Sequence, residues 1–161
     1  GKSISMGLHV KIYGGFAGTE TKLEERIANQ ENASILDGES KYRVIENNGG
    51  NIDPDDRLIP TTCVLDGFTI QNGSFKMGAG VYNLYASPTI SNCIFKNNEV
   101  TSEGGAMYNT SSSVNVVNCT ADNFSSAGRF RCPCRTFSFL LPHWQRILPR
   151  VRPASCLPPA R

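Results

Sequence analysis

Several residue types are scarce in this chain of 161 residues, and each shortage excludes a class of protein. No apolar run reaches the roughly 18 residues that a transmembrane helix needs, so the sequence predicts no membrane-spanning helix. Charged residues make up only 19% of the chain and hydrophobic residues 39%. This balance supplies enough apolar side chains for a core and argues against general disorder. The length is that of a single domain.

Charge and composition divide the chain into two unlike segments. Residues 1–128 contain all 14 acidic residues together with 6 Lys and 3 Arg, whereas residues 129–161 contain 7 Arg and no Lys, Asp or Glu. The first segment also contains every Gly and every Asn of the chain. Gly, Asn, Ser and Thr favour turns and caps over helix interiors, which argues against a helical bundle. An acidic segment of this kind also argues against nucleic-acid binding.

The break near Gly128 is abrupt, and residues 129–161 are predicted to lie outside the folded domain. Gly, Asn, Lys, Asp and Glu all disappear after this point, while Arg, Pro and Leu become frequent. We expect this Arg- and Pro-rich tail to be disordered or to derive from translation in a shifted reading frame, with a genuine cap or linker as the alternative. Its Cys132-Pro133-Cys134 and the distant His143 fall short of a zinc pattern. Repeat blocks that reappear when the DNA after codon 128 is read in the next frame would settle the choice.

A repeat runs through the first segment. Residues 65–72, 90–97 and 116–123 align at offsets of 25 and 26, with apolar or small residues in matching columns and Asn at each end. A second block, residues 78–83, matches residues 104–109 at an offset of 26. Two independent blocks with one period make chance similarity improbable, and short β-branched runs between Gly, Asn and Ser indicate strands and turns.

This period predicts an all-β fold, a parallel β-solenoid of about four coils over residues 8–127. Stacked coils bring equivalent residues about 4.8 Å apart, so like residues form ladders. We expect an amide ladder of Asn72, Asn97 and Asn123 at a turn. The strand columns predicted to supply the core contain Val64, Leu65, Phe68, Ile70, Ile90, Cys93, Phe95, Val116 and Cys119.

The N-terminal part fits the same fold. Alternating apolar residues over 8–13 predict a strand, and Thr21 with Glu24 resembles a capping box that begins one short lateral helix at about 21–28. Residues 36–38 repeat the Leu-Asp-Gly of residues 65–67 at an offset of 29. The polar stretch 47–56 is predicted to be a loop that accounts for this longer offset.

The repeat blocks resemble those of right-handed parallel β-helix proteins of bacterial surfaces, including the polymorphic outer membrane protein type of repeat. Gly104-Gly105-Ala106-Met107 is similar to that family's GGA-plus-aliphatic block, and Phe95-Lys96-Asn97-Asn98 fits its FxxN block. Residues 78–81 are a degenerate copy, and Ala121 stands where the FxxN block has Phe. The resemblance covers roughly residues 8–127. It implies a fold and a secreted or outer-membrane-associated location, but it carries no catalytic residues.

Candidate binding residues are few. Tyr82 and Tyr108 share a repeat column, and their alternation with Val81 and Met107 favours an outward direction. Outward rings would form an aromatic strip suited to stacking on sugars, whereas inward rings would belong to the core. These two tyrosines are therefore the possible glycan-facing residues.

Candidate acids and bases have simpler structural interpretations. Asp37 and Asp66 are the acids that recur in the Leu-Asp-Gly rows, and each is expected to fill a tight Asp-Gly turn rather than a catalytic column. The position of Asp66 becomes Ser91 and Val117 in the next rows. His9 stands on the first predicted strand without a visible partner. The densest acidic group is predicted to be a solvated loop rather than a calcium site, and consists of Asp53, Asp55 and Asp56.

The six cysteines divide equally between the two segments. Cys93 and Cys119 recur at matching repeat positions, which predicts stacked, buried free thiols rather than disulfides. The sequence predicts no catalytic residues, no cofactor and no metal.

The function predicted from the sequence is a structural or adhesive β-helix segment of a secreted or cell-surface bacterial protein. Its partner would be a polysaccharide or a host-surface or cell-surface ligand. The alternative is a fragment of a carbohydrate-active β-helix enzyme, a polysaccharide lyase or glycosidase, whose catalytic coils lie elsewhere. Because the chain starts at Gly1 rather than Met, we expect upstream residues, and no secretion signal is visible.

Overall fold

A computed structural model describes the chain at residues 2–7, 9–26, 33–49, 62–122 and 130–131. Short parallel strands dominate this part of the chain, and a short 3-10 turn, η1, lies at Leu23–Glu25. The fold is therefore all-β, as the Gly-, Asn- and Ser-rich composition predicted.

Three parallel sheets of four strands and one of two strands make up the fold. The first sheet contains β1 (Lys11–Tyr13), β4 (Val64–Asp66), β8 (Thr89–Ser91) and β12 (Asn115–Val117). The second contains β2 (Ser34–Asp37), β5 (Phe68–Gln71), β9 (Ile94–Lys96) and β13 (Thr120–Asp122). The third contains β3 (Ile45–Asn48), β7 (Val81–Leu84), β11 (Met107–Thr110) and β14 (Phe130–Arg131), and the two-stranded sheet pairs β6 (Ser74–Met77) with β10 (Glu99–Glu103).

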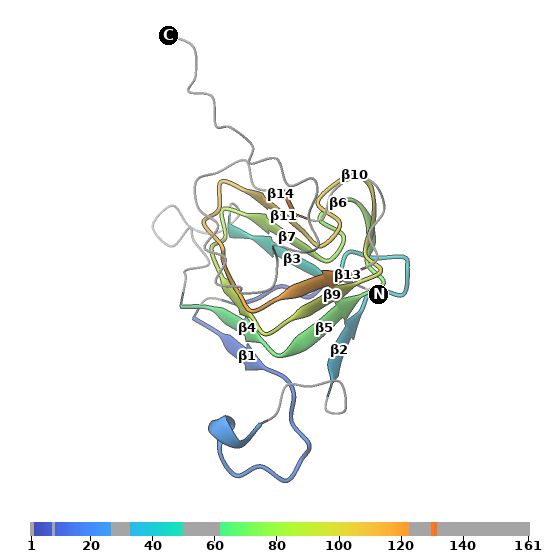
Figure 1. The fold of residues 1–161 in the computed structure, drawn as a ribbon. Helices are drawn as coiled ribbons and strands as arrows, with labels where there is room; N and C mark the ends of the chain where they lie inside the picture. The colour runs from blue at the N-terminus through green and yellow to red at the C-terminus, as the bar shows by residue number, and fades with distance from the viewer. Residues whose placement is uncertain (1, 8, 27–32, 50–61, 123–129, 132–161) are drawn as a thin grey trace.

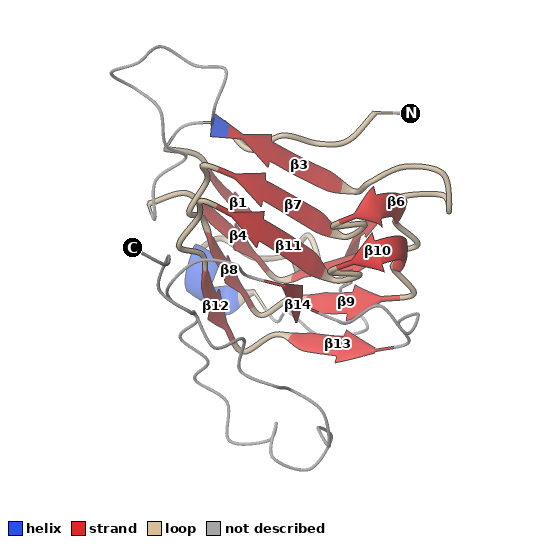
Figure 2. Cartoon of the chain, turned by 90° about the horizontal axis from the view of Figure 1, so that it is seen from above, coloured by secondary structure: helices blue, strands red, loops and turns tan. Residues whose placement is uncertain are grey.

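The chain visits these sheets in the same order on each of four successive passes, so strands far apart in sequence lie side by side (Figures 1 and 2). We call these passes coils: β1 to β3 form the first, β4 to β7 the second, β8 to β11 the third and β12 to β14 the fourth. Parallel sheets built in this way are compatible with a β-solenoid, in which each coil relies on its neighbours for burial.

The register confirms the repeat. Thr69 pairs with Ile94 and Ile94 with Thr120, which are separations of 25 and 26 residues. The change from 25 to 26 occurs within β10, where the register with β6 shifts between Val100 and Glu103. One additional residue in a β-bulge therefore accounts for the two offsets seen in the sequence.

The predicted 29-residue alignment of the Leu-Asp-Gly rows is wrong. Leu36 and Asp37 pair with Ile70 and Gln71 in the second sheet, whereas Leu65 pairs with Ile12 in the first. Both Leu-Asp segments end a strand before a Gly at a turn, so the same local requirement produced similar sequences in different sheets. Asp37 and Asp66 therefore do not share a column.

The core lies between the sheets and comes largely from the predicted columns. Seven of the nine predicted residues are fully buried: Leu65, Ile70, Ile90, Cys93, Phe95, Val116 and Cys119. The other two, Val64 and Phe68, are half-buried. Chain segments also approach one another closely, since a Cβ added to Gly80 would lie 2.4 Å from the carbonyl oxygen of Ala106. Gly is required there because no side chain fits.

The N-terminal part differs from the prediction in two details. Within the described part of the predicted helix at 21–28, only Leu23–Glu25 form a 3-10 turn, and Glu25 rather than Glu24 closes its capping box, accepting a hydrogen bond from the Lys22 N–H at 3.3 Å. Because Lys22 is the N-cap, the third residue of the turn is Glu25. Asn47 belongs to β3 rather than to the predicted loop at 47–56, of which residues 50–56 lie outside the described residues.

Segments from near both ends of the described chain lie along the two edges of the third sheet. Ile4 forms a parallel bridge with Ile45 on β3, and its backbone exchanges hydrogen bonds of 2.9 Å with Val44 and Glu46. At the opposite side, β14 pairs with β11 just beyond the predicted domain boundary at Gly128. The assignment of the rest of the tail remains a prediction, because residues 132–161 lie outside the described residues.

Candidate functional site

The two predicted glycan-facing tyrosines form an outward strip on the third sheet. Tyr82 on β7 pairs with Tyr108 on β11, while the residues before them, Val81 and Met107, are fully buried. The two rings are almost parallel, with an interplanar angle of 3° and centroids 5.7 Å apart. The outward direction inferred from alternation is therefore confirmed, and the glycan role remains a prediction.

A cation covers the other face of Tyr82. The guanidinium carbon of Arg43 lies 4.2 Å from the Tyr82 ring centroid and 4.1 Å from that of Phe75, so the cation stands between two aromatic rings. Arg43 is held there because it donates hydrogen bonds to the carbonyl oxygens of Met77 and Gly78. Such cation–π contacts are strongest where the cation is desolvated, and Arg43 is only 5% exposed.

This arrangement limits what the strip can do. Arg43 and Tyr108 occupy the two faces of the Tyr82 ring, so Tyr82 presents an edge and a hydroxyl group rather than a free face. Sugar stacking uses ring faces. A glycan at Tyr82 would therefore be bound through the ring edge and the phenol oxygen, which can donate and accept hydrogen bonds.

A shallow depression of about 420 Å³ adjoins the strip. Its lining includes Lys2 and Ser3 from the N-terminal segment, together with Arg43, Glu46 and Phe75. The Arg43 charge is balanced by Glu46, whose carboxylate lies 2.9 Å from the guanidinium. The depression thus combines an aromatic wall with hydroxyl and charged groups. Sequence reasoning missed Arg43 and Phe75 because neither has an equivalent aromatic or cation in another repeat.

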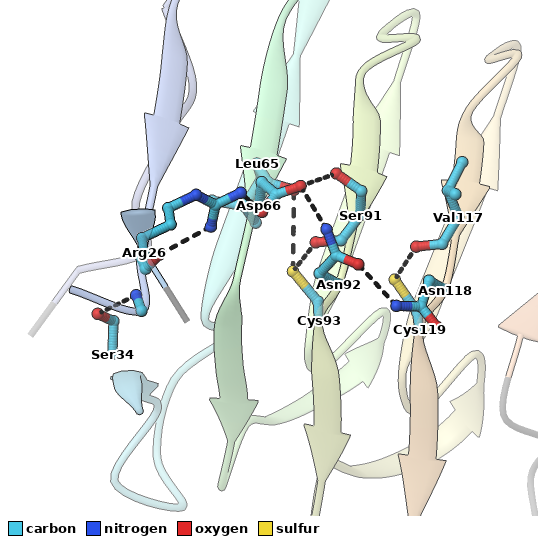
Figure 3. A network of polar contacts seen from close by, with 12 residues as sticks. Arg26, Ser34, Leu65, Asp66, Ser91, Asn92, Cys93, Val117, Asn118 and Cys119 are labelled. Carbon is cyan, nitrogen blue, oxygen red and sulfur yellow. Dashed lines mark hydrogen bonds and ion pairs between the residues drawn. The ribbon is translucent and has the colours of Figure 1, made fainter. Parts of the chain in front are cut away.

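A second group of polar side chains surrounds Asp66 at the end of β4 (Figure 3). Its carboxylate forms an ion pair with Arg26 and accepts hydrogen bonds from the Ser91 hydroxyl and, at 2.9 Å, from the Asn92 amide. The Asn118 amide in turn donates to Asn92 at 2.7 Å. Asp66 therefore does more than fill an Asp-Gly turn: it joins the first, second and third coils.

This group holds the coils together and does not resemble an acid–base pair. Asp66 pairs with Ser91, and Ser91 with Val117, so the strand column contains one carboxylate, as the sequence indicated. Both carboxylate oxygens of Asp66 already accept hydrogen bonds. Asp37 does fill a turn, because it accepts the Glu39 N–H, and the Gln71 amide donates to it across coils.

The main amide ladder lies inside the fold rather than at the predicted turn. Asn47, Asn83 and Asn109 are fully buried in one column of the third sheet; Asn47 donates its side-chain amide to the oxygen of Asn83 at 2.8 Å, and Asn83 to that of Asn109 at 2.7 Å. The Met6 N–H donates to Asn47 at 2.9 Å and closes the first end of the ladder. At the other end, Nδ2 of Asn109 is the one buried side-chain nitrogen or oxygen without a hydrogen-bond partner among the described residues.

The predicted turn ladder is only partly present. Asn72 and Asn97 both have φ near +50°, as expected for Asn at a sharp turn. The Asn72 amide, however, donates to Asp37 at 2.9 Å rather than to Asn97. The third predicted member, Asn123, lies outside the described residues.

The structure also describes two other kinds of candidate residue, His9 and the cysteines of the first segment. His9 is exposed in a turn before β1, not on the strand, and its Nδ1 lies 3.3 Å from the Thr62 hydroxyl. Cys63, Cys93 and Cys119 are buried free thiols, as predicted. The acidic group Asp53, Asp55 and Asp56 and the tail residues Cys132, Cys134 and His143 lie outside the described residues.

The described part of the chain contains neither a cluster of three potential metal ligands among His, Cys, Asp and Glu nor a helix with the length and apolarity to cross a membrane. In the comparisons with known proteins, no family model, no curated protein and no solved structure matches the chain.

Proposed function

We propose that this chain is a segment of a right-handed parallel β-helix from a secreted or cell-surface bacterial protein, and that it serves as a structural or adhesive stalk. The observation that carries the proposal is how its buried polar groups are used. Asn47, Asn83, Asn109 and Asp66 direct their side chains at neighbouring coils, where they stabilise the stack. Such a stack is a rigid support that can be extended coil by coil.

The adhesive role is assigned to the strip of Tyr82 and Tyr108 together with the adjoining depression. The strip faces outward from the third sheet, and the depression beside it offers Lys2, Ser3 and Glu46 as polar partners. Tyrosine edges, hydroxyl groups and charges in one place suit a ligand rich in hydroxyl groups. A surface polysaccharide is such a ligand.

A glycan-binding experiment tests this role. Immobilised pectin, alginate and a mixed glycan panel would be exposed to the full chain, to a Tyr82→Ser/Tyr108→Ser variant, and to Tyr85→Ser as a matched control. Tyr85 is also an exposed tyrosine, 45% accessible, but it lies outside the strip. We expect the double variant to lose at least about tenfold in affinity, equivalent to one good contact, and the control to retain binding.

Two outcomes would contradict the adhesive proposal. Equal losses in the strip variant and in Tyr85→Ser would show that the strip is not the contact, and an absence of binding to the whole panel would remove the glycan. Release of reducing ends or unsaturated products from the same panel, abolished by Asp66→Ala, would instead favour the alternative of a carbohydrate-active enzyme fragment.

A further inference from the structure

Cys93 and Cys119 occupy equivalent places in neighbouring coils. Cys93 precedes β9 and Cys119 precedes β13, and the next residues, Ile94 and Thr120, are register partners. The Thr120 N–H donates to the Cys93 carbonyl oxygen at 2.9 Å, which fixes the register at the cysteines themselves. Figure 3 shows the two side chains on adjacent strands.

The spacing of parallel strands suits a covalent link between these residues. Neighbouring strands lie about 4.8 Å apart, within the Cα separation of roughly 4.4–6.8 Å that disulfides span. Each thiol donates a hydrogen bond to the backbone carbonyl oxygen two residues before it, Cys93 to Ser91 at 3.1 Å and Cys119 to Val117 at 3.3 Å, so the two sulfurs have matching surroundings. The third thiol in the described residues, Cys63, instead lies before β4 and contacts the Gly7 carbonyl oxygen, so it provides an internal comparison.

The pair is asymmetric in a way that suits disulfide chemistry. The neighbouring Cys93 thiol lowers the pKa of Cys119 below its ordinary value, against the opposing effects of burial and of the Asp66 charge. The neighbouring Cys119 thiol, together with burial, raises the pKa of Cys93. Cys119 is therefore the sulfur that becomes a thiolate, the nucleophilic form, while Cys93 keeps its proton.

We propose that Cys93 and Cys119 are an oxidation site at which hydrogen peroxide closes a disulfide between the third and fourth coils. In the first step, the Cys119 thiolate attacks one peroxide oxygen, an S–O bond forms, the O–O bond breaks, and the departing hydroxide takes up a proton to leave as water. In the second step, the Cys93 sulfur attacks the Cys119 sulfur, an S–S bond forms and the S–O bond breaks. The released hydroxide takes the Cys93 proton and leaves as a second water.

These steps balance, because the two thiols together lose two electrons and two protons while peroxide is reduced to two water molecules. Both cysteines are only 1% exposed, so a reagent as small as peroxide is required and bulky thiols are excluded. A disulfide formed here would consequently resist reduction until the coils separate. The link would tie the fourth coil, the last one described, to the third.

Peptide mapping of the full chain tests the proposal. Trypsin cleaves after Lys76, Lys96 and Arg129, so Cys93 and Cys119 lie on separate peptides, 77–96 and 97–129. After exposure of the folded protein to peroxide and alkylation under denaturing conditions, we expect these peptides to be joined and Cys63 to be alkylated. The proposal is overturned if both cysteines are still alkylated at a peroxide exposure that oxidises them in the urea-unfolded chain, or if Cys119 is joined to another cysteine.

Two variants separate the roles of the sulfurs. In Cys93→Ser we expect Cys119 to remain as a sulfenic acid, since no partner thiol can resolve it, and dimedone added as the oxidised chain is unfolded in urea should trap it. In Cys63→Ser the link should form as in the parent chain. Dimedone labelling of Cys63 at the same rate as Cys119 would contradict a directed pair. If Cys93→Ser fails to fold, the mapping of the parent chain still decides the question.

Discussion

The first coil and the coils that follow it are held together by different chemistry. Strands of the first coil pair with their neighbours across separations of 53, 34 and 36 residues, whereas later separations are 25 or 26, apart from 23 between β11 and β14. Charged side chains make most of the contacts from the first coil: Arg26 with Asp66, Arg43 with the carbonyl oxygens of Met77 and Gly78, and Asp37 with Gln71. Pairs of like, neutral residues are more prominent between later coils, as in Asn83 with Asn109 and Asn92 with Asn118, although Asp66 also reaches the third coil and Asn47 begins the buried ladder in the first.

The difference shows what repetition supplies. A repeated Asn finds a partner amide in the next coil without further design, because equivalent positions recur about 4.8 Å apart. The first coil has no preceding copy, and its insertions break the period. Long charged side chains can reach across irregular spacing, and those of the first coil do so here. The first coil also leaves more apolar surface exposed, as at Ile35, which is 54% accessible.

The largest contrast is expected from the core. Phe95 is fully buried between the sheets of the third coil, whereas Phe16, before the lateral turn, is 43% exposed. We expect Phe95→Ala to lower the free energy of unfolding by about 4 kcal/mol, because the transfer energy is lost and a cavity remains. Phe16→Ala should cost well under about 1 kcal/mol. Urea denaturation of the two variants measures both values, and equal losses would contradict the proposed difference between the coils.

A smaller contrast is expected between two glycines. An added Cβ at Gly80 would collide with the Ala106 carbonyl oxygen of the next coil, so Gly80→Ala must push two coils apart and should cost about 3 kcal/mol. Gly18, in the first coil, has a φ of +90° but no atom within 4 Å of an added Cβ. Gly18→Ala should therefore cost only about 1 kcal/mol of backbone strain. Thermal unfolding of both variants would show whether spacing or backbone angle dominates.

The buried amide ladder should be sensitive to the loss of one rung. Asn83→Leu leaves the Asn47 amide and the Asn109 oxygen buried without partners, which should cost about 2 kcal/mol. Gln71→Ala removes the exposed hydrogen bond of 2.7 Å from the Gln71 amide to Asp37 of the first coil. This substitution should lower the free energy of unfolding by only about 0.3 kcal/mol.

A double variant distinguishes the ladder from simple misfit. The double variant Asn83→Leu/Asn109→Leu also removes the side-chain oxygen and nitrogen of Asn109, which would otherwise be buried without hydrogen-bond partners. The double variant should therefore be more stable than Asn83→Leu alone. If the losses from the two substitutions instead add, the amide hydrogen bonds are not what makes the single substitution costly. Urea denaturation of the parent chain, both single variants and the double variant measures the interaction.

The same contrast explains what the sequence could predict. Columns such as Ile70, Phe95 and Ala121 were visible because each position repeats, and so was the pairing of Tyr82 with Tyr108. Arg43 and Phe75 come together through insertions with no period, and no pattern indicated their contact. The buried amide ladder was not predicted for another reason. Asn83 and Asn109 align in sequence, but alternation alone does not reveal that a polar side chain points inward.

The smallest effect is expected at Asp37, where the first coil meets the second. The Gln71 amide, the Glu39 N–H and the Asn72 amide all donate to its carboxylate and lower its pKa below the ordinary value of 3.8. A lowered pKa in the folded state means that the charged form contributes stability above the unfolded pKa. That contribution is lost as the pH falls through the unfolded pKa toward the folded one.

Asp37→Asn should therefore destabilise the protein slightly at pH 7. Because Asp37 is exposed to solvent, the loss should be only about 0.3 kcal/mol. The difference between the parent chain and the variant should shrink as the pH falls below about 4, since the carboxyl group of the parent is then protonated as well. Urea denaturation of both proteins at several pH values measures this difference, and the titration of other carboxyl groups largely cancels. A gap that persists or widens at low pH would mean that the shape of the side chain, rather than its charge, joins the irregular first coil to the regular second coil.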